Sequence, residues 1–77
     1  MYRIKQYIIN LQDRKINENI FIENGILYLI TQDNRYKYEH DSWYINIENQ
    51  WITMQGGVPS YDSETCWDAD VFEKINE

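Results

Sequence analysis

The stretch IFIENGILYLIT, residues 20–31, decides the fold that this sequence predicts. It places Asn24-Gly25 between two apolar runs, and this dipeptide accepts the positive φ that both central residues of a type I′ hairpin turn require. A two-residue turn at this point puts Ile22 opposite Leu27, and Phe21 beside Tyr28. We therefore expect an antiparallel hairpin here, with further strands on either side.

The residues after this hairpin continue an alternation that is typical of strands. Gln32-Asp33-Asn34 is a turn signal, and RYKYEH, residues 35–40, then alternates aromatic and charged side chains, with His40 as its last member. WYINIE, residues 43–48, alternates apolar and polar side chains. Glu48-Asn49 predicts a turn into QWITMQ, residues 50–55.

The two ends of the chain are less regular than its middle. Residues 2–11 read as a strand through their β-branched content, or as a short helix with Ile4, Ile8 and Leu11 on one stripe, and we favour the strand. Residues 56–62 contain Gly-Gly and Val-Pro, which break the pattern, so we expect a loop there.

The closing segment changes to a helical period. From Ser63 onward the apolar residues recur at helical spacing, and Asp62 or Ser63 can cap the first turn. We therefore expect a helix over residues 63–75, whose apolar stripe covers one face of the sheet. The members of that stripe are Trp67, Val71, Phe72 and Ile75.

The predicted fold class is α+β, with a single domain over residues 1–77. Residues 1–55 form its β-sheet region, a small antiparallel β-meander of four to six strands, and one C-terminal α-helix packs on it. Twelve isoleucines and seven tyrosines against one alanine favour such a sheet. The core is expected to take the large aromatic residues Phe21, Trp43, Trp51 and Trp67.

No motif in the sequence names a catalytic or metal-binding chemistry. Cys66 has mostly acidic neighbours, which disfavour a reactive thiolate, and His40 is a single histidine with no spacing that links it to the cysteine. Asp68 and Asp70 diverge on a helix and lack the rhythm of a calcium loop. We therefore expect no enzyme activity, no cofactor and no metal.

The lone cysteine and the short apolar runs also predict where in the cell the protein is located. A single thiol is typical of a reducing environment, and no run approaches the ~20 apolar residues of a membrane span. The codon-biased composition, rich in Ile, Asn, Tyr and Lys, is compatible with a low-GC bacterium or its phage. The expected location is the cytoplasm of a bacterial host cell, without membrane contact.

The net charge of −6 is concentrated at the C-terminal end of the chain. Residues 60–77 hold six acids and one base, whereas residues 1–59 hold seven acids and six bases. The acidic side of the predicted helix is either a solvated face that keeps the protein soluble or a surface that competes with nucleic acid for a basic groove. Direct binding of DNA or RNA is disfavoured, because phosphates meet net repulsion.

The function class that remains is binding to a protein partner. We expect an inhibitor that occupies a basic groove of a nucleic-acid-handling protein, such as a nuclease or a CRISPR effector. In general character the chain is similar to phage-encoded anti-defence proteins and nucleic-acid mimics. A toxin immunity protein and a structural, self-associating protein are the alternatives, and a homodimer stays open. The residues expected to bind the partner are Asp62, Glu64, Asp70, Glu73 and Glu77 in the acidic segment, and Tyr36, Tyr38 and Tyr44 in the sheet.

Overall fold

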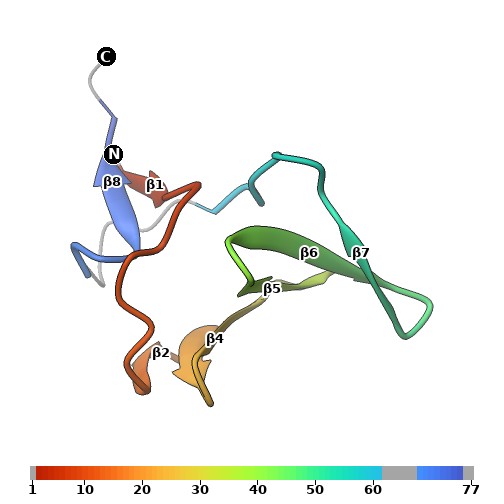
Figure 1. Ribbon diagram of the computed structural model, residues 1–77, viewed down its shortest axis with the longest axis horizontal. Helices are drawn as coiled ribbons and strands as arrows, with labels where there is room; N and C mark the ends of the chain where they lie inside the picture. The colour runs from red at the N-terminus through yellow and green to blue at the C-terminus, as the bar shows by residue number, and fades with distance from the viewer. Residues whose placement is uncertain (1, 62–67, 76–77) are drawn as a thin grey trace.

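The computed structural model describes residues 2–61 and 68–75, and within them the protein is all-β (Figure 1). Eight strands form two antiparallel sheets, a six-stranded sheet in the order β2-β3-β4-β5-β6-β7 and a two-stranded sheet of β1 and β8. No helix in these residues is long and apolar enough to cross a membrane. The strands are β1 (Tyr2–Ile4), β2 (Arg14–Asn17), β3 (Ile20–Glu23), β4 (Ile26–Ile30), β5 (Arg35–Glu39), β6 (Ser42–Ile47), β7 (Gln50–Thr53) and β8 (Phe72–Lys74).

The six-stranded sheet is an up-and-down meander, because short turns reverse the chain between neighbouring strands. Asn24-Gly25, His40-Asp41 and Glu48-Asn49 have positive φ at both positions, between 52° and 75°, as type I′ turns require. The first turn sets the predicted register, with Ile22 opposite Leu27. The hairpin at residues 20–31 and the turn before β7 are therefore confirmed.

The structure corrects the prediction for one turn and confirms the prediction for another. His40 was expected at the end of a strand, but its φ of 53° places it in the turn between β5 and β6. The turn predicted at residues 32–34 is confirmed, and Thr31 and Asn34 bracket it through a backbone hydrogen bond of 2.8 Å. The Asp13 carboxylate accepts hydrogen bonds from the backbone N–H groups of Asn24 and Gly25, at 3.2 and 3.1 Å.

The predicted C-terminal helix is wrong wherever the structure describes it, so the α+β class gives way to an all-β fold. Residues 63–67 lie outside the described residues. Asp68 opens a turn in which its carbonyl accepts hydrogen bonds from the backbone N–H groups of Val71 and Phe72, at 3.1 and 2.8 Å. β8 then pairs with β1, with Phe72 opposite Ile4. Phe72 is buried and Lys74 exposed, so the segment follows the period of a strand.

The N-terminal segment forms a strand only at its start. The expected strand over residues 2–11 is confirmed for Tyr2–Ile4, and this strand joins the small sheet and not the meander. Residues 5–13 run irregularly from there to β2. The Lys5 backbone links both sheets, because its N–H donates to the Val71 carbonyl at 2.8 Å and its carbonyl accepts from Trp43 Nε1 at 3.2 Å.

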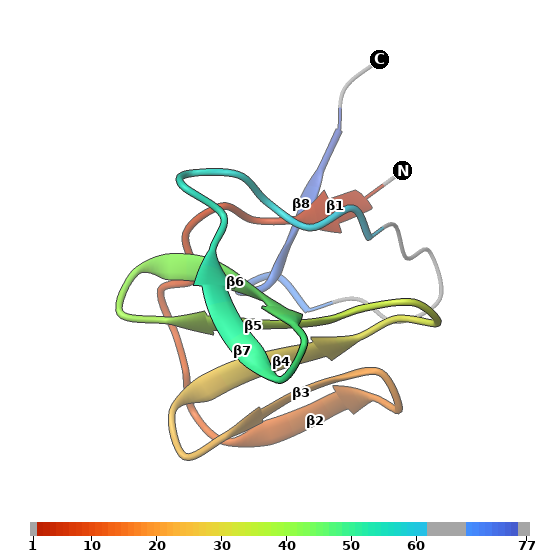
Figure 2. The same ribbon diagram turned by 90° about the vertical axis from the view of Figure 1, so that its right-hand side faces the viewer.

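One hydrophobic core joins the two sheets, since the small sheet and its flanking residues lie against one face of the meander (Figure 2). We call this face of the six-stranded sheet the inner face and the opposite one the outer face. Strand alternation assigns residues to one face or the other throughout the meander. The core consists of Ile4, Ile8, Val71 and Phe72 from the terminal segments and Ile20, Ile22, Leu27, Leu29, Tyr38 and Trp43 from the inner face.

Candidate functional site

The outer face carries a group of aromatic rings around one lysine. Lys37 Nζ lies 4.9 Å from the centre of the Trp51 ring and 5.5 Å from the centre of the Tyr44 ring. The rings of Phe21 and Tyr28, 5.5 Å apart, continue the group across β3 and β4. We call these five residues the aromatic face, and every ring in it is at least partly exposed.

Strand register brings the members of the aromatic face together. Tyr28 lies opposite Phe21 on one side and opposite Lys37 on the other, and Lys37 lies opposite Tyr44. Cross-strand neighbours of this kind have Cβ atoms ~5 Å apart, so their side chains touch along the row. Trp51 adds its ring from β7. The face is therefore built on regular strands, where the backbone hydrogen bonds of the sheet hold each side chain in place.

Lys37 is itself restrained. Its Nζ lies 3.0 Å from a carboxylate oxygen of Glu39, two residues further along the same side of β5, and only 16% of its side chain is exposed. The lysine stem therefore lies along the rings while its charge is shared between the carboxylate and two aromatic faces. This arrangement keeps the ammonium group from extending into solvent and fixes the two rings beside it.

The placement of the large aromatic residues corrects the sequence interpretation. Trp43 is buried, at 3% exposure, as expected, but Trp51 is 38% exposed and Phe21 lies on the outer face. Trp67 lies outside the described residues. The meander has one face open to solvent, and alternation sends Phe21 to the side opposite Ile22. The sequence held a signal for this, because its predicted register put the more apolar Ile22 and the aromatic Phe21 on different faces.

The three tyrosines predicted to bind a partner have different positions. Tyr44 belongs to the aromatic face, whereas Tyr36 is partly buried against the core from the inner face. Tyr38 is only 1% exposed, so its predicted place at the surface is wrong. Burial disfavours the phenolate and raises the pKa of Tyr38; the Ile8 backbone opposes this shift, and the nearby Asp41 adds to it. The hydroxyl of Tyr38 has no hydrogen-bond partner among the described residues.

The described acids of the predicted binding face form ion pairs and hydrogen bonds with other residues of the same chain. Glu73 accepts a hydrogen bond of 2.8 Å from Arg3 Nε, and Asp70 lies 3.7 Å from Arg14 Nη2. Asp70 also accepts from Asn10 Nδ2 at 3.0 Å. These contacts neutralise part of the C-terminal negative charge with the basic N-terminal segment. The other acids predicted there, Asp62, Glu64 and Glu77, lie outside the described residues, as does Cys66.

Asp68 makes the best-formed ion pair of the described chain. Its carboxylate accepts from Arg14 Nε at 2.8 Å and from Arg14 Nη2 at 3.2 Å, which is a bidentate pair. The same carboxylate accepts from the Asp70 backbone N–H at 3.0 Å. The hydrogen bond from Arg14 is the main reason that the pKa of Asp68 is lowered and that of Arg14 raised. This pair explains why an acid stands among apolar residues in the closing segment.

A different set of acids lies at the two ends of the meander. Acidic residues stand at or beside each of the turns between the strands of the meander, so they lie at both ends of the sheet. All five are exposed, and none forms a salt bridge with another described residue. We call this set the acidic rim, and it consists of Glu18, Glu23, Asp33, Asp41 and Glu48.

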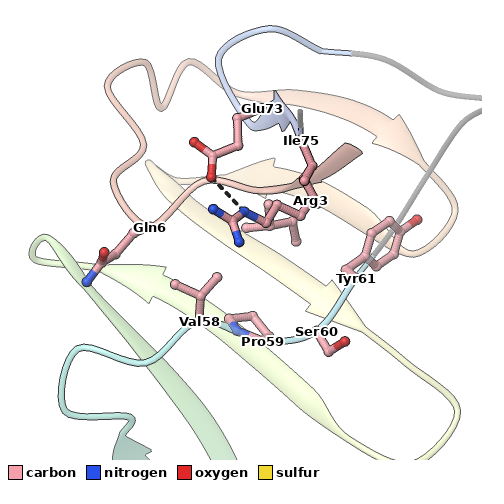
Figure 3. Close-up of a pocket in the computed structure, with 9 residues that line it drawn as sticks. Arg3, Gln6, Val58, Pro59, Ser60, Tyr61, Glu73 and Ile75 are labelled. Atoms are coloured by element: carbon pink, nitrogen blue, oxygen red, sulfur yellow. Dashed lines mark hydrogen bonds and ion pairs between the residues drawn. The ribbon is translucent and has the colours of Figure 1, made fainter. Parts of the chain in front are cut away.

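A pocket of about 520 Å³ lies on the other side of the molecule, between the small sheet and residues 58–61 (Figure 3). Its wall is largely apolar, with Val58 and Pro59 facing the Arg3–Glu73 pair. Among the described residues, no histidine lines it. The Arg3 guanidinium is already bound to the Glu73 carboxylate, so the described residues of the wall offer no unpaired charge that would fix a small ligand.

The described residues contain no arrangement that suggests a metal centre. Nowhere in residues 2–61 and 68–75 do three or more His, Cys, Asp or Glu side chains gather as metal ligands would. His40 is exposed in its turn, and Asp68 and Asp70 both face Arg14. The aromatic face with its acidic rim is therefore the strongest candidate for a functional surface.

Comparison of the chain with protein-family models, curated proteins and solved structures gave no significant match, so the assignment of function depends on this surface alone.

Proposed function

We propose that this protein acts by binding a protein partner with a basic surface, and that the aromatic face with its acidic rim is the binding surface. By occupying a basic groove of a nucleic-acid-handling protein, such as a nuclease or a CRISPR effector, it acts as a stoichiometric inhibitor without catalysis of its own. The encounter takes place in the cytoplasm of a bacterial host cell. A toxin immunity protein would use the same surface, with the toxin as partner.

The observation that supports this proposal is the combination of exposed rings at the centre and unpaired acids at the edge. Protein interfaces place aromatic anchors in a desolvated centre and charges in a wet rim. Trp and Tyr are the commonest anchors, and Trp51 and Tyr44 are held beside Lys37 on a regular sheet. Anchors that are already ordered lose little conformational entropy when they bind.

The negative charge of the acidic rim favours a partner with a basic surface. Glu23 and Glu48 stand at turns on opposite ends of the sheet, so a partner that covers the aromatic face meets an exposed acid near each end. Basic residues on the partner would be attracted over a distance of about a Debye length, which speeds association. Lys15 and Arg35 also lie on this face, but the net charge of −6 and the acids at both ends of the sheet favour a protein over a nucleic acid.

The proposal is tested by capture of partners from bacterial lysate on immobilised protein, after nuclease treatment, with a Tyr44→Ser/Trp51→Ser variant run in parallel. Loss of two anchors should weaken capture of the true partner by about 100-fold or more, since a hot-spot residue contributes about 2 kcal/mol. Tyr7→Ser is the matched control, because Tyr7 is 62% exposed but lies outside the aromatic face.

A second measurement decides between the classes of ligand. We expect the captured protein to be basic and its activity on nucleic acid to fall to zero at an equimolar amount of inhibitor. A labelled single-stranded oligonucleotide should not bind, because its stacking on the rings would have to overcome the acidic rim. Oligonucleotide binding that requires Tyr44 and Trp51, or equal capture by the double variant and the wild type, would refute the proposal.

A further inference from the structure

The two edges of the six-stranded sheet differ in a way that bears on self-association. An edge strand offers unpaired backbone groups to other strands, and proteins commonly protect it with charged residues, proline or a bulge. β2 has such protection, because it carries Arg14 and Lys15 and its pairing with β3 is interrupted between Lys15 and Asn17. β7, Gln50–Thr53, has no charged residue and no proline, and its register with β6 is regular.

The outward backbone groups of β7 can be identified from the ladder. Hydrogen-bonded and non-hydrogen-bonded pairs alternate along an antiparallel pair of strands. The Met54 N–H donates to the Trp43 carbonyl at 2.9 Å, so Met54 points its backbone groups toward β6. Ile52 does the same, two residues earlier. Trp51 and Thr53 therefore direct their N–H and C=O groups away from the sheet.

We propose that β7 is a self-association edge, and that it pairs with β7 of a second copy of this chain in an antiparallel arrangement around a two-fold axis. A continuous sheet keeps the inner faces of both copies on the same side. Residues whose side chains point to the inner face must therefore lie opposite inner-face residues of the second copy. With Ile52 opposite Ile52 of the second copy, Trp51 lies opposite Thr53 of the second copy. All the outward N–H and C=O groups of both residues are then paired.

The side chains fit this register. Ile52 is 43% exposed on the inner face, and a non-hydrogen-bonded pair at the axis brings its Cα to ~4.5 Å from its counterpart. Ile45, opposite Ile52 within the sheet, and the 47% exposed Ile47 extend the apolar strip on that face. On the outer face, the 38% exposed Trp51 would lie beside Thr53 of the second copy.

The edge strand itself carries no charge that would oppose a second copy. The chain has a net charge of −6, so two copies repel one another in general, yet no charged residue lies in β7 itself. Approach through β7 therefore brings no like charges of the edge strands together. Since β2 is protected, β7 cannot add to the other edge of the next copy, and the assembly closes as a dimer instead of growing into a filament.

The test is the oligomeric state of the intact chain, measured by sedimentation equilibrium and light scattering over a range of concentrations. We expect a concentration-dependent dimer for the wild type, and loss of that dimer for Ile52→Glu, because two carboxylates would meet at the axis. Ile30→Glu is the matched control, since Ile30 is 39% exposed but lies on β4, inside the sheet. Thr53→Pro removes one outward N–H and should also give a monomer, with the circular dichroism of the sheet unchanged.

A mixing experiment tests the register. Ile52→Lys and Ile52→Glu chains should each be monomeric alone, and their mixture should form a mixed dimer that native mass spectrometry detects by its mass. A wild type that stays monomeric at all concentrations would overturn the proposal, even if it captured a strand from another protein. An Ile52→Glu dimer as stable as the wild type, or absence of the mixed dimer, would overturn the β7 pairing. Trp51 belongs to both the aromatic face and this seam, but every measurement here uses the purified chain without a partner, so these outcomes can be told apart from a failure of partner binding.

Discussion

The bidentate ion pair between Arg14 and Asp68 should stabilise the fold by an amount that a double-mutant cycle can measure. The pair joins β2 to the C-terminal segment across 54 residues of sequence. Its side chains are 25% and 19% exposed, so it is neither a surface pair nor a fully buried one. Arg14 also donates to the Gln12 carbonyl at 2.9 Å, so a single guanidinium holds two irregular segments against the sheet.

The magnitude follows from these contacts. A hydrogen bond to a charged group contributes about 1.5–3 kcal/mol when it is protected from water, and partial exposure reduces this. We expect Asp68→Asn to lower the free energy of unfolding by about 2 kcal/mol. Arg14→Gln should cost about 2–3 kcal/mol, because it leaves Asp68 and Asp70 without their cation. The coupling energy of the pair should be about 1–2 kcal/mol.

The assay is urea denaturation of the wild type, the two single variants and the double variant, followed by tryptophan fluorescence. The Arg3–Glu73 pair supplies a control of the same chemistry, because its side chains are 62% and 41% exposed and exposed pairs couple by about 0.2–1 kcal/mol. A coupling energy for Arg14 and Asp68 that is no larger than for Arg3 and Glu73 would refute the argument.

Four further predictions follow from single residues. The stabilisation from Asp68 should depend on pH, because the pKa of its carboxyl is lowered in the folded state. The difference in unfolding free energy between the wild type and Asp68→Asn should be complete above pH 3.8 and should vanish as the pH falls through the lower folded-state pKa. Urea unfolding midpoints measured over a series of acidic pH values would show this. Phe72→Ala should cost about 3–5 kcal/mol by urea denaturation, because the ring is 1% exposed and packs 5.8 Å from Tyr61. Tyr38→Phe should leave the stability within about 0.5 kcal/mol or raise it, since it removes a buried hydroxyl without a partner; a loss above about 1.5 kcal/mol would reveal a hydrogen bond. Gly25→Val should cost about 1–2 kcal/mol in thermal unfolding through its φ of 75°, because a Cβ there meets no atom within 4 Å.

Most of the correct predictions concern contacts between residues that are close in sequence. The Asn24-Gly25 turn fixes its own hairpin, since a two-residue type I′ turn leaves only one register for the strands that it joins. From that register the pairing of Ile22 with Leu27 followed directly. The aromatic face was within reach of the same reasoning, because the residue between two core positions must point to the other side.

The predicted acidic helix shows what sequence periodicity cannot decide. Trp67, Val71, Phe72 and Ile75 recur at helical spacing, but β8 is a strand of three residues, too short for an alternation that the sequence could reveal. The strand exists because β1, some seventy positions away, supplies its hydrogen-bond partners. A helix satisfies its own backbone, whereas a strand depends on a partner elsewhere.

The sequence by itself determined the meander, because its turns and alternation act over a few residues. The tertiary structure decided which charges remain free. Asp68, Asp70 and Glu73 look like an acidic surface in the sequence, yet Arg14 and Arg3 reach them from the other end of the chain. Whether a carboxylate faces solvent or a guanidinium depends on contacts between distant segments, and those contacts exist only after the two sheets have packed around one core.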